Sequence, residues 1–442
     1  MQWRKKALAG LLVSLVCGAA LATTRPIGPE LAPVADGLNV NDFIFDCTPF
    51  GCTTTGYSPR DDADEGKLRL MCDPSHLSYN DPIVFPGRAG ATHLHHFFGN
   101  SLTDHNSTYQ SLRSTGEGSC QGGKMNRSGY WFPAMIKTDT NKVVVPDWIE
   151  LYYNVSRGQL WDESSSGGYI SVDCVSKGGS GLLLDGRTAA CPMYAPGPLE
   201  RGLKAIFGAY AATGTFPTGY VRDGNASGRN FEWSCTASGS GKAVLWDAAT
   251  PSNGVEGCPA GTTVQVRMDA PSCWNGAYDS DDHYTHFAFA TGDSNGVGIC
   301  PSSHPYRIPA LAVIIAWSHN GEADYKTWKL SSDIFNGANF RTGETFHTDA
   351  FWAWNDTVQE TFHINVNGMH PTPGVTPYTD NASGINGVGA NHIKSASDGY
   401  LGNLTALIQN GVDLSALPPA SRYIDIPANS AKKGGRGKGG MR

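Results

Sequence analysis

The sequence predicts a mainly β fold, a β-sandwich or jelly-roll-like arrangement with long loops and a few short helices. Gly accounts for 54 of the 442 residues and Pro for 26, and both residue types interrupt long helices. Short runs rich in β-branched and aromatic residues recur between turn signals, as is typical of strands. These runs are residues 143–145, 149–153, 264–268, 286–290, 310–317 and 362–366. Only two segments, 200–210 and 401–410, favour short helices.

The chain is expected to divide into a leader, an N-terminal extension, one large domain and two C-terminal segments. A basic start precedes an apolar run that ends in Ala20-Leu21-Ala22, which is the pattern of a secretory signal peptide and its cleavage site. The expected segments are a signal peptide (1–22), an N-terminal extension (23–41), a single large β-rich domain (42–370), a C-terminal loop-rich segment (371–430) and a basic Gly-rich tail (431–442). Two packed β-rich halves in place of one domain would also fit this length.

Cysteine usage agrees with secretion. Ten cysteines follow the signal peptide, and an even number in a secreted chain predicts disulfides rather than metal thiolates. The sequence does not determine their connectivity, and pairing of sequence neighbours is the simplest hypothesis. This hypothesis pairs Cys47 with Cys52, Cys72 with Cys120, Cys174 with Cys191, Cys235 with Cys258 and Cys273 with Cys300.

Glycosylation signals and charge point the same way. Seven N-x-Ser/Thr sequons are typical of an extracellular glycoprotein; they begin at Asn106, Asn126, Asn154, Asn225, Asn355, Asn381 and Asn403. A net charge of −7 with 17% charged residues argues against a nucleic-acid partner. After the leader, no apolar stretch approaches about 20 residues, so no membrane anchor is expected.

Six of the thirteen histidines lie in three short clusters that are far apart in the chain. The clusters are His93-Leu94-His95-His96, Asp282-His283-Tyr284-Thr285-His286 and His347-Thr348-Asp349. Residues two apart on a strand share a face, so the first and third clusters can each present two polar groups in one direction. Imidazoles and carboxylates transfer protons near neutral pH and bind Zn, Mn or Fe. The repetition therefore indicates one site built from all three clusters.

The clusters lie within longer motifs that occur in a fixed order. They are Asp81-Pro82-Ile83-Val84-Phe85-Pro86-Gly87, His93 to Asn100, Gly129-Tyr130-Trp131-Phe132-Pro133, Pro271-Ser272-Cys273-Trp274-Asn275-Gly276, Cys300-Pro301-Ser302-Ser303-His304-Pro305 and Phe346 to Phe351. Together they resemble the secreted fungal and bacterial family known as Domain of Unknown Function 1996, from about residue 42 to about 355. The resemblance implies a secreted protein with one large domain and no particular reaction. Thr348 departs from the family pattern, in which a small residue usually separates this His and Asp.

Two chemistries fit the clustered residues. In the first, a divalent metal ion is bound by imidazoles, the candidates being His93, His95, His283, His286 and His347. In the second, no metal is needed and Asp282 and Asp349 act as acid/base groups, with His283 and His95 as further catalytic candidates. Asp81, Asp279 and Asp281 are other carboxylates near these motifs. Substrate contacts are expected from Trp274, Trp131, Trp352 and Arg267.

We expect a secreted carbohydrate-active enzyme that cleaves an extracellular polysaccharide, as a glycoside hydrolase with a His/Asp cluster. A polysaccharide lyase would use the same region, with His283 or Tyr284 as the base and Arg267 beside the substrate carboxylate. A non-catalytic glycan- or cell-wall-binding protein and a metal-binding secreted protein also fit the sequence. The expected partner is a polysaccharide, and the sequence does not indicate an oligomeric state.

Overall fold

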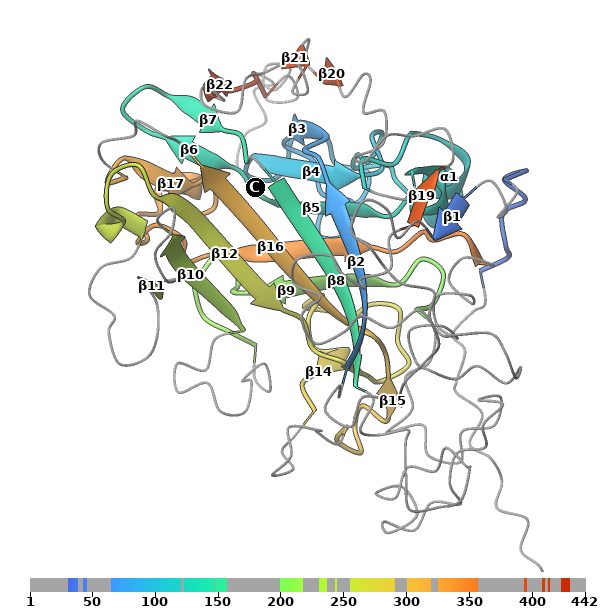
Figure 1. Cartoon of the computed structure of the whole chain (residues 1–442). Coiled ribbons are helices and arrows are strands. Elements are labelled where there is room, and N and C mark those ends of the chain that lie inside the picture. The colour runs from blue at the N-terminus through green and yellow to red at the C-terminus, as the bar shows by residue number, and fades with distance from the viewer. Residues whose placement is uncertain are drawn as a thin grey trace, which may run out of the picture.

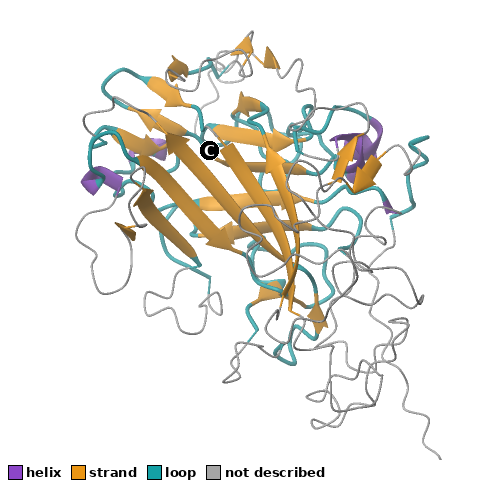
Figure 2. Cartoon of the chain, viewed as in Figure 1, coloured by secondary structure: helices purple, strands orange, loops and turns teal. Residues whose placement is uncertain are grey.

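The computed structural model describes most of the central part of the chain and a few outlying segments. The described residues are 31–38, 43–45, 65–120, 123–146, 148–156, 199–217, 230–236, 243–244, 255–290, 300–318, 325–356, 393–395, 408–409, 412–413 and 423–429. The expected signal peptide, the basic tail, the strand 362–366 and two of the five cysteine pairs lie outside these residues. The described part is mainly β, as predicted, and Figure 2 shows strands and loops with little helix.

Two antiparallel sheets form the body of the molecule. The larger sheet has six strands, in the order β11 (Ala243–Val244), β10 (Phe231–Thr236), β12 (Thr263–Asp269), β16 (Ala310–Ser318), β8 (Trp148–Ser156) and β2 (Glu65–Cys72). The second has five strands, in the order β3 (His76–Ser78), β4 (His95–Gly99), β5 (Gly129–Pro133), β18 (His347–Phe351) and β9 (Lys204–Gly208). The strands of the second sheet run behind those of the first and cross them (Figure 1).

The core lies between these two sheets and is built from aromatic side chains. Phe132 of β5 packs edge-on against Trp317 of β16, with ring centroids 6.2 Å apart. The hydroxyl oxygens of Tyr130 on β5 and Tyr153 on β8 are 2.5 Å apart, and Trp352 Nε1 also donates to Tyr153 Oη at 3.2 Å. Burying a large apolar side chain stabilises a fold by roughly 1.5–3 kcal/mol. The face of β5 that carries Tyr130 and Phe132 therefore points toward the core. Because successive side chains of a strand point to opposite faces, Trp131 lies on the outer face.

Strand β12 shows how the sequence pattern positions the larger sheet. Its residues Val264, Val266 and Met268 are buried, and the residues between them are exposed or half-buried. This period-two pattern is the signal of a strand with one solvated face. The predicted strands 143–145, 149–153, 264–268 and 310–317 correspond to strands, and the run at 286–290 is reduced to Phe287–Ala288.

Smaller sheets and short helices complete the described fold. A four-stranded sheet has the order β17 (Trp328–Leu330), β6 (Met135–Lys137), β7 (Lys142–Val144) and β22 (Tyr423–Asp425), and a three-stranded sheet has β14 (Phe287–Ala288), β13 (Cys273–Trp274) and β15 (Tyr306–Arg307). Two strand pairs are β1 (Phe43–Phe45) with β19 (Ile393–Ser395) and β20 (Ile408–Gln409) with β21 (Val412–Asp413). The helices are α1 (Tyr109–Ser114) and the 3-10 turns η2 (Gly123–Met125), η3 (Val255–Gly257) and η4 (Phe335–Gly337).

The predicted helix at 200–210 is wrong. Residues Lys204–Gly208 form β9, which pairs with β18 along its whole length. The Lys-Ala-Ile-Phe-Gly segment has no helical period, and the ladder to β18 overrides the helix propensity of the residues before it. The predicted helix at 401–410 lies outside the described residues, except for the strand residues Ile408–Gln409.

Three predicted disulfides are present; two tie loops to the six-stranded sheet, and the third ties a loop to the three-stranded sheet. They are Cys72–Cys120, Cys235–Cys258 and Cys273–Cys300. Each closes a loop of a few tens of residues and is expected to add roughly 2–4 kcal/mol to the free energy of unfolding. The pairs Cys47–Cys52 and Cys174–Cys191 lie outside the described residues.

The sequons differ in their exposure. Asn106 is exposed, so a glycan can be attached there. Asn126 is fully buried, and its Oδ1 accepts from the backbone of Ser128 and the hydroxyl of Tyr130. Asn355 is half-buried, and its Nδ2 donates to Asp36 Oδ2 at 3.1 Å. The expectation of a glycan at Asn126 is therefore wrong for the folded chain, because a buried amide has no room for a sugar.

Candidate functional site

The site lies on the outer face of the five-stranded sheet, opposite the core. Trp131, Asp349 and Ile206 form one row across β5, β18 and β9. His347 lies two residues from Asp349 on the same strand, so both side chains leave the same face. His95 begins β4 and is paired with Pro133 of β5. The sheet therefore brings the first and third histidine clusters together, as the sequence predicts.

Three histidines converge on this face. One nitrogen each of His93, His95 and His347 lies within 4.8 Å of the other two. The ring centroids of His93 and His95 are 4.2 Å apart, and those of His93 and His347 are 5.2 Å apart. Atoms that share a tetrahedral ion through bonds of about 2.1 Å lie roughly 3.4 Å apart. A small rotation of the rings would therefore let this cluster hold a metal ion.

Hydrogen bonds fix which nitrogens point into the cluster. The Nδ1–H of His95 donates to the carbonyl of Asn80 at 3.0 Å, and the Nδ1–H of His347 donates to the carbonyl of Thr345 at 2.8 Å. Because a carbonyl can only accept, Nε2 of each ring keeps its lone pair. Among the described residues, Nε2 of His93 and of His95 has no hydrogen-bond partner. This outer hydrogen bond with a free inner nitrogen is the usual arrangement of metal-ligating histidines.

Burial keeps the three rings neutral. His93 is 6% exposed, and the other two are more deeply buried. Loss of solvent lowers the pKa of His95 to about 3 and that of His347 to about 4. It also lowers the pKa of His93 well below its usual value, and the neighbouring histidines add to this effect. Neutral imidazole is the form that binds metals.

Two buried carboxylates accompany the histidines. Asp349 is fully buried, and neither carboxylate oxygen has a hydrogen-bond partner among the described residues; Oδ2 is 3.9 Å from His347 Nε2. Burial, and then the nearby Asp81 carboxylate, raise the pKa of Asp349 well above its usual value. Asp81 accepts from the backbone N–H groups of Ile83 and Val84. Burial still raises its pKa to about 6.

A cavity of about 590 Å³ opens onto this centre, a size typical of small-molecule sites. Asp81, His93, His347 and Asp349 line its sheet side, and the loop that carries His283 lines another side. Further lining residues are Val84, Phe85, Thr92, Ile206, Tyr210, Ala211, Ala212, Asp282, Tyr284, Phe335, Asn336, Gly337 and Ala338. All three histidine clusters therefore contribute to one cavity.

His283 belongs to the cavity wall and lies outside the three-histidine cluster. Its Nδ1 is 2.9 Å from Asp279 Oδ1, and this hydrogen bond raises the pKa of His283. Its backbone is left-handed, with φ of 64°, a conformation that costs a non-Gly residue about 1–2 kcal/mol. The N–H of Ile206 on β9 donates to its carbonyl at 3.3 Å, which anchors the loop to the sheet.

Asp282 has a structural environment. Its Oδ1 accepts from the backbone N–H groups of Tyr284 and Thr285, from the hydroxyl of Thr285 and from Ser280 Oγ, while Oδ2 accepts from Tyr210 Oη. Although burial opposes it, these hydrogen bonds together lower the pKa of Asp282. A carboxylate held ionised by so many donors is poorly suited to donate a proton. This environment does not favour the predicted role of Asp282 as an acid/base group, which stays a prediction.

His286 is not placed to bind a metal. Its Nε2–H donates to the carbonyl of Lys204 at 2.7 Å, and its Nδ1 is 3.0 Å from Ser280 Oγ. Both nitrogens are occupied and the ring is fully buried, so His286 ties its loop to β9. The metal-ligand expectation for this residue is corrected on these grounds.

None of the four expected substrate contacts lines the cavity. Trp131 and Trp274 are 0% exposed and Trp352 is 2% exposed, so their faces are covered by protein. Trp131 stacks on Phe97 beneath the site, with ring centroids 5.3 Å apart. Arg267 lies on the exposed face of β12, where it is paired with Asp269. Trp131 supports the site from below, and the other three are outside the cavity.

Some residues at the site carry no usable signal in the sequence. Tyr210 reaches the cavity from the turn after β9, and Phe335 and Asn336 reach it from η4. The carbonyls of Asn80 and Thr345 orient His95 and His347. A backbone carbonyl does not depend on residue type, so no sequence motif announces it.

The fold and site define a class of protein: an antiparallel β-sheet protein with a buried His/Asp centre under an open cavity. Its disulfides are typical of an oxidising compartment. The chain belongs to the family described as a domain of unknown function (DUF1996), whose sequence profile matches residues 81–354. All three histidine clusters and Asp81 lie within that match. No curated protein and no solved structure matches the chain. Among the described residues, no helix is long and apolar enough to cross a membrane.

Proposed function

We propose that this protein is a secreted glycoside hydrolase that cleaves an extracellular polysaccharide in the cavity above the five-stranded sheet. One observation carries the proposal: an unpartnered, buried carboxylate, Asp349, lies beside three imidazoles whose free nitrogens face one another at the base of an open cavity. Leaving buried polar atoms without partners costs roughly 1–3 kcal/mol each. Such a cost is typical of a site arranged for a ligand rather than for stability.

In this proposal Asp349 and Asp81 are the acid/base pair. Two carboxylates on either side of a glycosidic bond are the usual requirement of glycoside hydrolysis. No described residue donates a hydrogen bond to the carboxylate of Asp349, and the carboxylate of Asp81 accepts two backbone N–H groups on Oδ1. The raised pKa of Asp81, about 6, supports proton exchange near neutral pH.

His93, His95 and His347 are proposed to bind a divalent metal ion. Three neutral imidazoles fit Zn or another borderline metal, and the cavity leaves room for a further ligand. When bound, such an ion polarises an oxygen or lowers the pKa of a bound water. Hydrogen bonds from Nδ1 of His95 and of His347 to backbone carbonyls hold these two rings in their orientation. A secreted metal-binding protein without hydrolase activity is the second candidate, and the convergence of the same three rings favours it.

Metal content and sugar release test the two parts separately. We expect about one divalent ion per molecule by elemental analysis of the protein purified from metal-supplemented medium. His93→Ala and His347→Ala should lose that ion, whereas His304→Ala, which changes a histidine near the surface, should keep it. Absence of metal from the wild-type protein would contradict the metal site.

For hydrolysis, we expect the wild-type protein to release reducing sugars from at least one member of a panel of fungal, plant and bacterial polysaccharides. Asp349→Asn and Asp81→Asn should lower the rate at least 100-fold, as is usual for loss of an acid/base group. Stoichiometric metal with no product from any polysaccharide would favour the second candidate over the hydrolase.

A further inference from the structure

A second cavity of about 810 Å³ adjoins the one above the His/Asp centre. The two share walls. On the loop after β3, Asp81 lines the first cavity and Pro82 the second. In the other wall, His283 lines the first, Asp279 lines the second, and the two residues are hydrogen-bonded at 2.9 Å. Consecutive residues and a hydrogen-bonded pair thus link the linings of the two cavities.

The sheet beneath continues from one cavity into the other. Asp349 pairs with Ile206 under the first cavity, and the next outward-facing pair, Phe351 with Lys204, lies under the second. Two residues along a strand correspond to about 7 Å. The second cavity thus begins one such step from the proposed acid/base group. A ligand extending past Asp349 along β18 would enter it.

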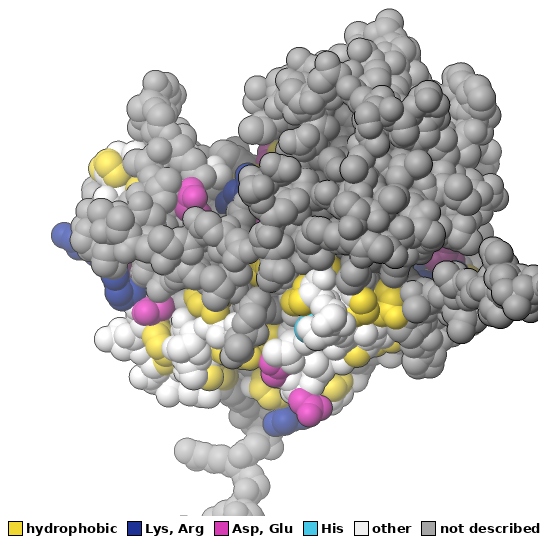
Figure 3. Space-filling model, turned by 90° about the horizontal axis from the view of Figure 1, so that it is seen from below, with side chains coloured by type: hydrophobic (Ala, Val, Ile, Leu, Met, Phe, Trp, Pro, Cys, Tyr) yellow, Lys and Arg dark blue, Asp and Glu magenta, His cyan; other side chains and the backbone are white. Residues whose placement is uncertain are grey.

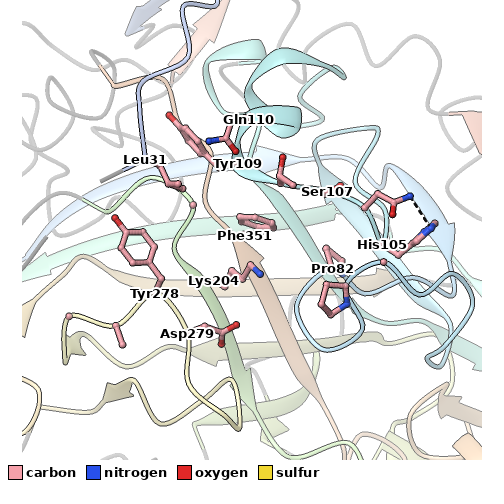
Figure 4. Close-up of a pocket in the computed structure, with 17 residues that line it drawn as sticks. Leu31, Pro82, His105, Ser107, Tyr109, Gln110, Lys204, Tyr278, Asp279 and Phe351 are labelled. Atoms are coloured by element: carbon pink, nitrogen blue, oxygen red, sulfur yellow. Dashed lines mark hydrogen bonds between the residues drawn. The ribbon is translucent and has the colours of Figure 1, made fainter. Parts of the chain in front are cut away.

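Lys204 gives this cavity an unmatched positive charge. Among the described residues, Lys204 is the only Lys or Arg that lines either cavity. No carboxylate of the described residues forms an ion pair with its ammonium group. Its Nζ is 5.2 Å from the centre of the Phe351 ring, and Figure 4 shows the side chain extending into the cavity beside Phe351. Asp279, the acidic residue of this cavity, is already engaged by His283. An anionic group is the missing partner.

The remaining lining combines an aromatic ring with hydrogen-bonding groups. Tyr278 is half-buried and lies on one side of the cavity, and Ser107 lies on another (Figure 4). Gln110 adds an amide at the rim, on the first turn of α1. Aromatic faces with a small number of polar groups are suited to a ring that is apolar on its faces and polar at its edge. A sugar residue has this character.

We propose that the second cavity is a subsite of the same glycan chain and takes an acidic sugar residue, whose carboxylate pairs with Lys204. This proposal rests on the proposed function and adds the substrate class: a polysaccharide that contains uronic acid. A half-buried ion pair of this kind discriminates strongly between a carboxylate and a neutral hydroxymethyl group, because the neutral group leaves the ammonium unpaired.

Calorimetric binding tests the subsite without cleavage. The Asp349→Asn protein would be titrated with short uronic-acid oligosaccharides of several linkages and with the carboxyl-reduced, neutral form of each. We expect at least one acidic oligosaccharide to bind tenfold or more tightly than its neutral form. Adding Lys204→Met should abolish that difference, and adding Lys142→Met, at an exposed lysine of β7 outside both cavities, should leave it intact. Thermal melting confirms that both variants fold.

Equal affinity for acidic and neutral forms, no binding by any acidic oligosaccharide, or an unchanged preference in Lys204→Met would each overturn the subsite. Cleavage of neutral polysaccharides alone by the wild-type protein would overturn it and leave the hydrolase intact. Acid-selective binding with no cleavage by the wild-type protein would leave the subsite and contradict the hydrolase.

Discussion

At the residue scale, two aspartates of one cavity have opposite environments. Asp282 accepts hydrogen bonds from five donors, and these hold its loop together. Asp349 is fully buried and accepts none from the described residues. The first arrangement stabilises the fold, and the second costs stability because a buried carboxylate loses its hydration. The difference separates a structural acid from one that is available for chemistry.

Substitution of these two residues should therefore act in opposite directions. We expect Asp349→Asn to keep or raise the free energy of unfolding, by up to about 2 kcal/mol, because it removes a desolvated acid. Asp282→Ala should lower it by about 1–3 kcal/mol through the lost hydrogen bonds. Urea unfolding of both variants measures this. A clear loss of stability in Asp349→Asn would show that the carboxylate is structural and would count against its role in the site.

At the element scale, the end of β9 sets the position of His347. Gly208 pairs with His347 and has φ of +113°. A Cβ at this position would lie 2.4 Å from the carbonyl oxygen of Phe346 and 2.7 Å from the Cα of His347. Strand β9 can approach β18 this closely only because residue 208 has no side chain. The spacing of the histidine cluster thus depends on a glycine that is not itself a ligand.

Gly208→Ala should consequently damage both stability and metal binding. We expect a loss of about 2–4 kcal/mol in the free energy of unfolding and weaker metal retention, because the new methyl group must push on the backbone of His347. Gly261→Ala is the matched control, since its φ is +73° and nothing lies within 4 Å of the added Cβ; strain alone should cost about 1 kcal/mol there. Equal effects of the two variants on metal content would contradict this coupling.

At the scale of the whole molecule, buried neutral histidines make the fold sensitive to acid. His76 makes no hydrogen bond to the candidate metal ligands. Its Nε2–H donates to the carbonyl of Thr103 at 3.0 Å, and its Nδ1 is 2.7 Å from Ser75 Oγ. Burial lowers its pKa to about 4. Protonation is then more favourable in the unfolded chain. The stability that this residue contributes is complete above about pH 6.5 and is lost as the pH falls toward 4.

The stability lost on replacing His76 should therefore depend on pH. We expect His76→Asn to destabilise the protein by about 2 kcal/mol less at pH 5 than at pH 7, since 1.5 pH units below the ordinary histidine pKa correspond to about that free energy. Denaturant unfolding of the two proteins at both pH values gives the difference. An effect that does not vary with pH would mean that His76 is not held neutral by burial.

The described surface on the face shown in Figure 3 carries no concentrated patch of charge. On the described part of the face shown in Figure 3, acidic and basic side chains are few and scattered, among hydrophobic and uncharged ones. The chemistry is concentrated in the two cavities, where the charged groups are enclosed. A ligand is therefore expected to be recognised inside these cavities rather than by a charged surface.

The sequence by itself predicted most of the strands and the placement of His347 and Asp349 on one face, because these follow from local periodicity. It left the cysteine connectivity open, and three of the pairs in its simplest hypothesis are present in the structure. Tertiary structure decided the rest. It alone distinguished Asp81 from Asp282, and His93 from His286, since these residues differ in their hydrogen-bond partners and not in type. It also made 204–208 a strand and buried the tryptophans, because pairing with β18 and packing depend on segments far away in the sequence.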